Sequence, residues 1–103
     1  MGITRSNTLE ENRFKSISDF KWCMKRGGEV QFDWQGVSYC CFGCVCPAPG
    51  KEPLMLISQA GSVEVNTRTA KWCDTADEVL EYMVGDDRLR DVITQVTVWD
   101  RTI

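Results

Sequence analysis

The chain has 103 residues, 43% of them apolar and ten of them aromatic, and a formal net charge of −3. This length and apolar content indicate one small domain with a single core and exclude a globally disordered chain. A run of about 18 apolar residues and the apolar core of a signal peptide are both missing, so we expect a cytosolic protein without a membrane span. Residues 1–13 are polar and predict a flexible arm, which leaves residues 14–103 as the folded domain.

The first helix of this domain is predicted to begin at a capping box. Ser16 and Asp19 have the required spacing, and Gly27 and Gly28 end the helix. Its inner face consists of Ile17, Phe20, Cys23 and Met24. Its outer side and last turn carry three cations, which form either a solvated face that complements the helix dipole or a basic patch. These cations are Lys21, Lys25 and Arg26.

The middle of the chain has the pattern of strands. Residues 29–34 alternate apolar and polar side chains, and Gln35 and Gly36 form a two-residue turn into a second strand at residues 37–45. The segment PAPGKEP at residues 47–53 predicts a loop. After it we expect a third strand at 54–59, a turn at 60–62, a short fourth strand at 63–65 and a polar link at 66–71.

A second capped helix is predicted after Trp72. Thr75 and Glu78 have capping-box spacing, so the Thr hydroxyl accepts from the amide of Glu78 and the Glu carboxylate reaches back to the amide of Thr75. Gly85 is placed as the left-handed stop. The apolar stripe follows i, i+3, i+4, i+7 spacing and consists of Ala76, Val79, Leu80 and Met83.

A short helical turn and a strand complete the chain. Asp86 or Asp87 is expected to cap this turn. Its inner face is Leu89, Val92 and Ile93. Val96 and Val98 then alternate with polar neighbours, as in a strand with one buried face. The order is a helix, a meander of three or four strands, a second helix, a helical turn and a closing strand. It predicts an α+β fold with the helices on one face of a mainly antiparallel sheet.

Four of the six cysteines lie within YCCFGCVC, as Cys40, Cys41, Cys44 and Cys46. One interpretation is a zinc site, because Cys41 and Cys44 have zinc-knuckle spacing. Against it stand the absence of a second such pair and of histidine, and strand alternation, which points Cys41 away from the other three. The favoured interpretation is that the cysteines are small buried hydrophobic residues, with no cofactor.

The sequence carries no catalytic motif. Without histidine there is no histidine-based acid–base pair and no Ser-His or Cys-His nucleophile. The glycine patterns of phosphate and dinucleotide sites are missing. Asp86, Asp87 and Asp91 do not have EF-hand spacing. We therefore expect a protein that is not an enzyme.

Charge is distributed unevenly along the chain. Residues 1–60 have a balance of +1 and residues 61–103 a balance of −4. An acidic C-terminal half disfavours nucleic-acid binding, which needs a basic footprint, and suits a basic protein partner. The simpler interpretation is that these carboxylates are helix caps and a solvated face.

Three segments carry a resemblance to a known family, namely DFKWCMKRGGEVQFDWQG (19–36), WCDTADEVLEYMV (72–84) and LRDVITQVTVWDRT (89–102). The chain resembles a family of small proteins from phages and mobile elements of Gram-positive bacteria. Some small acidic proteins of this origin are similar to anti-CRISPR proteins that act on Cas9-type effectors. The resemblance brings no catalytic residues. Residues 40–66, with the cysteines and the PAPGKEP loop, depart from the family pattern, which speaks against a family-wide zinc site.

The resemblance implies a protein-binding inhibitor of a host defence effector in the bacterial cytoplasm. The guide and target channel of a Cas9-type effector is positively charged. The residues expected to contact it are Asp77, Glu78, Glu81, Asp86 and Asp87. An alternative is a zinc- or nucleic-acid-binding accessory protein that uses the cysteine cluster and the basic side of the first helix. A third is a homodimer, with candidate anchors Trp22, Trp72 and Trp99.

Overall fold

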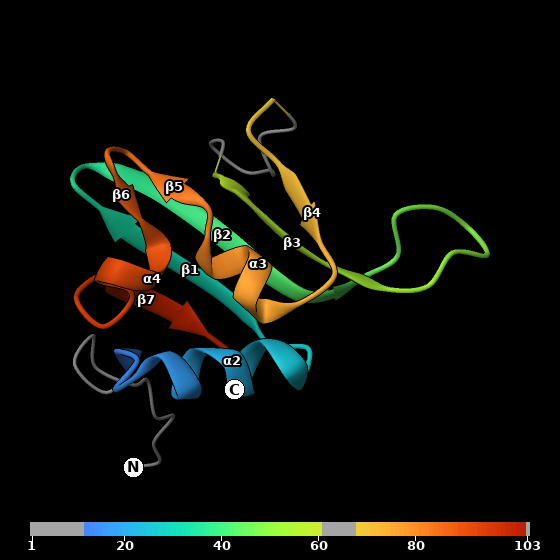
Figure 1. The fold of residues 1–103 in the computed structure, drawn as a ribbon, viewed down its shortest axis with the longest axis horizontal. Coiled ribbons are helices and arrows are strands. Elements are labelled where there is room, and N and C mark those ends of the chain that lie inside the picture. Colours follow the sequence, from blue (N-terminus) through green and yellow to red (C-terminus); the bar gives the residue numbers. More distant parts are fainter. Residues whose placement is uncertain (1–11, 61–67, 103) are drawn as a thin grey trace, which may run out of the picture.

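The computed structural model describes residues 12–60 and 68–102 and confirms the α+β class. Five strands form one antiparallel sheet in the order β4-β3-β2-β1-β7 (Figure 1). The described helices lie on one face of it, and β5 and β6 form a separate two-stranded ribbon. The helices are α2 (Ile17–Lys25), α3 (Ala76–Leu80) and α4 (Leu89–Val92). The strands are β1 (Glu29–Trp34), β2 (Val37–Val45), β3 (Leu54–Gln59), β4 (Lys71–Cys73), β5 (Met83–Val84), β6 (Asp87–Arg88) and β7 (Thr97–Arg101).

The first helix begins as its capping box predicts. The amide of Asp19 donates to the Ser16 Oγ over 3.1 Å, and the Asp19 carboxylate accepts from the amide of Lys15 over 3.1 Å. The helix then packs closely against β2 at Gly43. A Cβ at Gly43 would lie 2.3 Å from the carbonyl oxygen of Met24, so only glycine fits this contact.

The predicted hairpin is confirmed. Trp34 pairs with Val37 at the end of β1 and β2, and the two residues between them both have positive φ, 52° for Gln35 and 81° for Gly36. Two consecutive left-handed residues make the type I′ turn, whose twist matches that of the flanking strands. The third strand is also confirmed, as β3.

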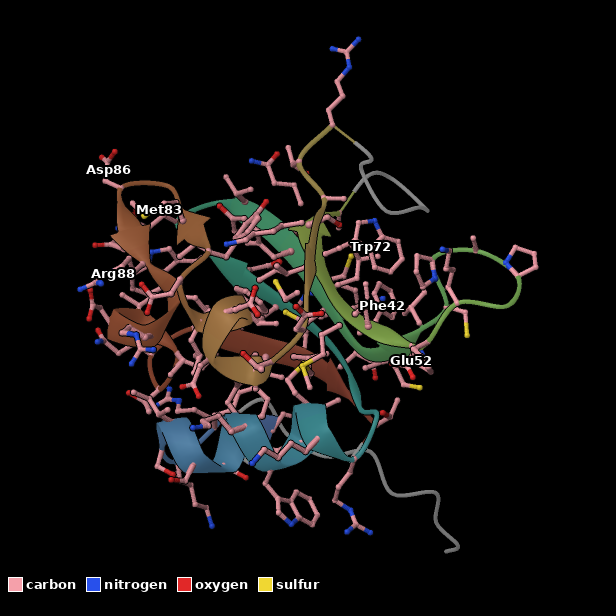
Figure 2. All side chains as sticks on the ribbon, turned by 45° about the vertical axis from the view of Figure 1, so that its right-hand side comes forward. Phe42, Glu52, Trp72, Met83, Asp86 and Arg88 are labelled. Carbon is pink, nitrogen blue, oxygen red and sulfur yellow. The ribbon has the colours of Figure 1, made fainter. Side chains whose placement is uncertain are left out.

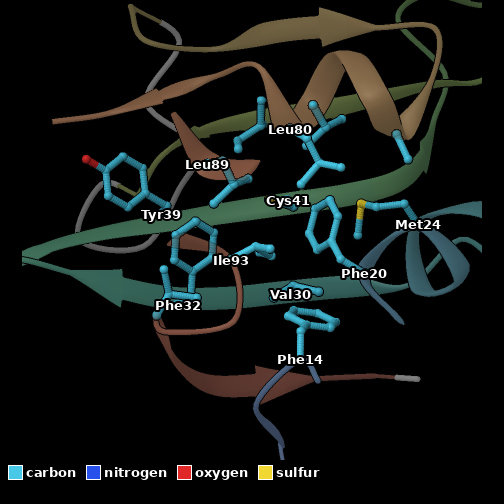
Figure 3. Packing of buried hydrophobic residues seen from close by; sticks show 14 of the residues in the cluster. Phe14, Phe20, Met24, Val30, Phe32, Tyr39, Cys41, Leu80, Leu89 and Ile93 are labelled. Carbon is cyan, nitrogen blue, oxygen red and sulfur yellow. The ribbon is translucent and has the colours of Figure 1, made fainter. Parts of the chain in front are cut away.

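The core fills the space between the sheet and the helices (Figure 3). Phe32 and Tyr39 stack on the sheet with ring centroids 5.3 Å apart, and Phe14 meets Phe20 edge-on at 5.2 Å. Asn12 is also buried, and its carbonyl accepts from the Arg101 Nη1 over 3.0 Å. The fold therefore includes residue 12, which the sequence assigned to the arm. Residues 1–11 of that arm lie outside the described residues.

The second predicted helix is shorter than its apolar stripe indicates. The Thr75 Oγ1 accepts from the amide of Glu78 as predicted, but the Glu78 carboxylate reaches the amide of Asp74 rather than that of Thr75. Helix α3 ends at Leu80, and Met83 lies in β5, 53% exposed, instead of on the buried stripe.

The packing of two residues outside the stripe, one partly and one fully buried, explains this early end. Tyr82 packs edge-on against Tyr39 with centroids 6.3 Å apart, and its hydroxyl donates to the carbonyl of Thr69 over 2.8 Å. Val84 is fully buried in the core. A continued helix would turn both side chains away from these contacts. Gly85, with a φ of 72°, therefore joins β5 to β6 instead of ending a helix.

The predicted cap of the last helical turn is wrong, whereas its inner face is confirmed. Helix α4 begins after Arg88 and has no side-chain cap. The carboxylate of Asp87 is engaged elsewhere, because it accepts from the Trp34 Nε1 over 3.1 Å. The buried residues of this last part are Leu89, Val92, Ile93, Val96 and Val98, as the sequence predicts.

The fourth strand of the sheet was not predicted where it occurs. The proposed strand at 63–65 lies outside the described residues. Strand β4 pairs Trp72 with Leu56 and Cys73 with Met55, so Lys71 belongs to the sheet and not to a polar link. Three residues are too few for strand alternation to be recognised in a sequence.

Candidate functional site

Two of the predicted acidic residues belong to a network of ion pairs on the helical side. Lys21 Nζ lies 3.0 Å from Asp77 Oδ2, and Arg90 Nε lies 2.6 Å from Glu81 Oε2. Arg90 also approaches Asp77 at 3.8 Å, and Arg88 approaches Glu81 at 3.2 Å. The hydrogen bond from Arg90 is the largest cause that lowers the pKa of Glu81. This surface therefore has mixed charge.

The other three predicted carboxylates are not gathered with this pair. Glu78 caps α3 through the amide of Asp74, and Asp87 binds the indole of Trp34. Asp86 is exposed in the turn between β5 and β6 (Figure 2). Of the five carboxylates, only Asp77 and Glu81 share a partner among the described residues, Arg90.

The structure separates the four clustered cysteines. Cys41 is fully buried in the core, and burial together with neighbouring thiols raises its pKa well above the ordinary value. Cys40 points to the opposite face, where its Sγ lies 3.4 Å from the Ser58 Oγ. The hydrophobic interpretation is thus confirmed for these two residues. It is wrong for Cys44 and Cys46, which are exposed.

An irregular register between Phe42 and Val45 explains the exposure of Cys44 and Cys46, since it ends regular alternation before these residues. Within residues 12–60 and 68–102, no group of three or more Cys, Asp or Glu side chains is placed to hold a metal ion. The sequence-derived zinc tetrad would need side chains from both faces of β2, Cys41 on one and Cys40 on the other.

The face of the sheet opposite the described helices carries a row of large apolar side chains. Phe42, Leu56 and Trp72 are register partners on β2, β3 and β4, and they alternate with the core residues of these strands. Trp72 is 42% exposed and Phe42 is partly exposed, whereas Leu56 between them is buried, as are Cys40 and Ser58 in the middle of the same face. Figure 2 shows both side chains on the side of the sheet away from α3. We call this face, from β4 to β7, the open face.

The other half of the open face is acidic. Glu29, Asp33 and Asp100 take its outward positions on β1 and β7, and none of them forms an ion pair with the described residues. The outward positions of β1, β2, β3 and β7 include no Lys or Arg. These positions are residues 29, 31, 33, 38, 40, 42, 45, 54, 56, 58, 97, 99 and 100.

Trp99 is held beside this acidic half. A register shift in the pairing of β1 with β7 leaves Trp99 as the extra residue of a bulge, 46% exposed. Its Nε1 donates to the Asp33 Oδ1 over 3.1 Å, and the Ser38 Oγ donates to the same oxygen over 2.6 Å. The indole and the carboxylate are thereby fixed side by side. Bulges of this kind serve to re-aim a side chain at the edge of a sheet.

Sequence reasoning named Trp72 and Trp99 only as possible anchors of a dimer and missed the carboxylates beside Trp99. The polar residues that alternate with apolar ones along the strands are visible in the sequence, but on sequence grounds alone they are interpreted as solvent-facing positions. Pairing was the missing information, because only the strand order brings Asp33, Asp100 and Trp99 onto one face.

Comparison with protein-family models, with curated proteins and with solved structures found no match. The resemblance to a family from phages and mobile elements therefore stays a prediction. Among the described helices, none has the length and apolar character needed to cross a bilayer.

Proposed function

We propose that this protein is a non-enzymatic binding module that docks another protein on the open face of its sheet. The observation that carries the proposal is Trp72, 42% exposed beside the partly exposed Phe42 on the face of the sheet opposite the described helices. Aromatic residues that are large, rigid and half-exposed are the typical anchors of protein interfaces. The lack of histidine supports a role in binding rather than in catalysis.

The partner to test first is a Cas9-type effector in the cytoplasm of a bacterial host. The resemblance to proteins of phages and mobile elements supports this choice. A positively charged effector channel is also complementary to a face that carries Glu29, Asp33 and Asp100 without cations among its strand positions. The acidic residues of the helical side contribute less, because Asp77 and Glu81 are already paired with cations of this chain.

The test is capture of a purified Cas9-type effector by the immobilised protein, with and without RNase. We expect Trp72→Ala to reduce capture by about tenfold or more, as for an interface anchor. Trp22→Ala is the matched control, since Trp22 is 50% exposed on α2, where the Arg26 guanidinium lies 4.7 Å from its ring centroid. Capture that both variants weaken equally, or neither weakens, contradicts docking on the open face.

A third variant separates the two acidic surfaces. Asp86→Lys reverses an exposed charge of the surface that the sequence indicates, without removing an ion pair of the described residues. Loss of capture by Asp86→Lys with retention by Trp72→Ala would move the docking surface to the β5–β6 side. Loss by Trp72→Ala alone supports the open face.

A further inference from the structure

We infer that the partner docked on the open face is a positively charged protein segment that also carries an apolar side chain. This inference rests on the proposed function and specifies the chemistry of the partner. The face is divided, with Phe42, Leu56 and Trp72 on β2 to β4 and with Asp33, Asp100 and Trp99 at the β1–β7 edge. The first half is complementary to an apolar side chain and the second half to a cationic one.

Charge complementarity identifies the partner of the acidic half. On the helical side two carboxylates are paired with cations of this chain, Asp77 with Lys21 and Glu81 with Arg90. On the open face, Glu29, Asp33 and Asp100 have no such pair with the described residues. A Lys or Arg from another protein can supply the missing positive charge.

The geometry of Trp99 favours a guanidinium or an ammonium group. Its indole is fixed by the hydrogen bond to Asp33 and remains nearly half exposed. An aromatic face beside a carboxylate offers a cation two attractive contacts, one with the ring quadrupole and one with the charge. Because both groups are held before binding, little side-chain freedom is lost when a cation docks there.

The same charges argue against two other occupants. A second copy of this chain stacked with like halves together would bring its own Glu29, Asp33 and Asp100 against these carboxylates, and such like-charge contacts are costly. Stacked with unlike halves together, it would place its apolar half over them and supply no cation from the outward positions of β1, β2, β3 and β7. A nucleic acid would present phosphates to these carboxylates. A cationic protein segment avoids both conflicts.

Strand spacing sets the length of the segment. Strands β4 and β7 are four places apart in the sheet, and neighbouring strands lie about 4.8 Å apart, so their separation is about 19 Å. An extended peptide advances about 3.3 Å per residue and spans this distance in about six residues. The segment would therefore carry its apolar residue and its cation about six positions apart.

The test is an NMR titration of the full chain with three short capped peptides. The first has two leucines at one end, two arginines at the other and a Gly-Ser-Gly-Ser spacer. The second replaces the arginines by glutamates, and the third replaces the leucines by serines. The four tryptophan indole signals are the readout. Trp22 on α2 and Trp34, bound to Asp87, serve as internal controls.

We expect the leucine–arginine peptide to shift the indole signals of Trp72 and Trp99 together and to leave those of Trp22 and Trp34 in place. The glutamate peptide should bind more weakly by about tenfold or more, because it brings like charges together. Raising the salt from about 20 mM to about 300 mM should weaken binding of the leucine–arginine peptide and leave the glutamate peptide no weaker.

Variants separate this inference from the proposed function. The double change Asp33→Asn with Asp100→Asn should abolish the response of Trp99, while the amide oxygen introduced at position 33 can still accept from Ser38. Asp91→Asn is the matched control on α4, where Asp91 forms an exposed pair with Arg88.

Equal binding of the arginine and glutamate peptides at Trp72 would overturn the inference and leave the docking surface standing. Shifts confined to Trp22, or no shift at any indole, would also overturn it, whereas the proposed function is judged by the effect of Trp72→Ala on effector capture.

Discussion

At Gly43 the backbones of α2 and β2 come into direct contact. Glycine is required there because a side chain has no room, and not because the backbone conformation demands it. A Cβ there would lie 2.3 Å from the Met24 oxygen and 2.9 Å from the Cα of Gly27. Both neighbours are backbone atoms, which cannot move aside without shifting the helix. The exposed Cys44 follows Gly43 directly, in the part of β2 where the register with β3 shifts.

We predict that Gly43→Ala lowers the free energy of unfolding by about 3 kcal/mol, at the upper end of the cost of overpacking. Gly50→Ala is the control, since Gly50 has open space around its Cα but a φ of 80°. The control should lose only about 1 kcal/mol, for the left-handed conformation. Urea unfolding measures both, and equal losses would contradict the close packing of α2 on β2.

We predict that two of the six thiols react rapidly with a water-soluble thiol reagent in the native protein, and that all six react after unfolding. The fast pair is Cys44 and Cys46, which are exposed. Burial raises the pKa of Cys23, Cys41 and Cys73, so these groups are both inaccessible and protonated. Mass spectrometry of the labelled peptides identifies the sites. Protection of Cys44 and Cys46 by added zinc would revive the metal interpretation.

At the scale of elements, the sequence predicts where structure begins better than where it ends. The caps at Ser16 and Thr75 and the Gln35-Gly36 turn are local signals, and the structure contains all three. The end of α3 is decided by contacts distant in sequence, such as that of Tyr82 with Tyr39. The spacing of apolar residues does not show where these distant contacts end the helix, because the same spacing fits a longer helix.

We predict that Thr75→Ala lowers the free energy of unfolding by about 1 kcal/mol, because the amide of Glu78 loses its acceptor at the start of α3. Thr75→Ser keeps the hydroxyl and should retain most of the stability. Thermal unfolding of the two variants side by side measures the difference. A loss as large in Thr75→Ser as in Thr75→Ala would show that the methyl group, not the cap, matters.

At the scale of the whole molecule, Arg101 joins the last strand to the N-terminal segment of residues 12–19. Its guanidinium pairs with Asp19 of α2 at 2.9 Å, donates to the carbonyl of Asn12 and lies 4.3 Å from the ring centroid of Phe14. Burial by itself would raise the pKa of Asp19, but hydrogen bonds from Arg101 and from the amide of Lys15 outweigh it, so the pKa lies below the ordinary value.

This depressed pKa predicts a loss of stability in acid. A carboxyl group whose pKa is lower in the folded state stabilises the fold above its unfolded pKa of about 3.9. That contribution disappears as the pH falls through the lower, folded value. Asp19→Asn should therefore be less stable at neutral pH and should show a smaller further loss below about pH 4. Urea unfolding across this range measures the slope.

Glu81→Gln is the control for the acid prediction. The pKa of Glu81 is also lowered, chiefly by the hydrogen bond from Arg90, but this side chain lies at the surface and is 43% exposed. Solvent screens exposed pairs, so this variant should follow the unmodified protein closely. A flat profile in Glu81→Gln with an unchanged slope in Asp19→Asn would contradict the role of the Arg101 pair.

The fold class could be predicted from the sequence because caps, turn residues and alternation are local. The composition of the open face could not, because it is a product of strand order. Asp33 and Trp99 lie 66 positions apart and meet only because β7 pairs with β1. The predicted acidic surface consists of residues that are close in sequence. In the structure two of them, Asp77 and Glu81, form ion pairs with cations of the chain itself.

The placement of β7 beside β1 also has a kinetic consequence. Val30 pairs with Arg101, so the sheet is complete only after segments 71 positions apart have met. Closing so long a loop costs entropy before any contact repays it, and proteins dominated by such pairings fold in milliseconds to seconds rather than microseconds. Until that moment β1 keeps an unpaired edge, the kind of surface on which partly folded chains aggregate. Conditions that delay the docking of the last strand, more than those that loosen the helices, should decide how much of this protein refolds.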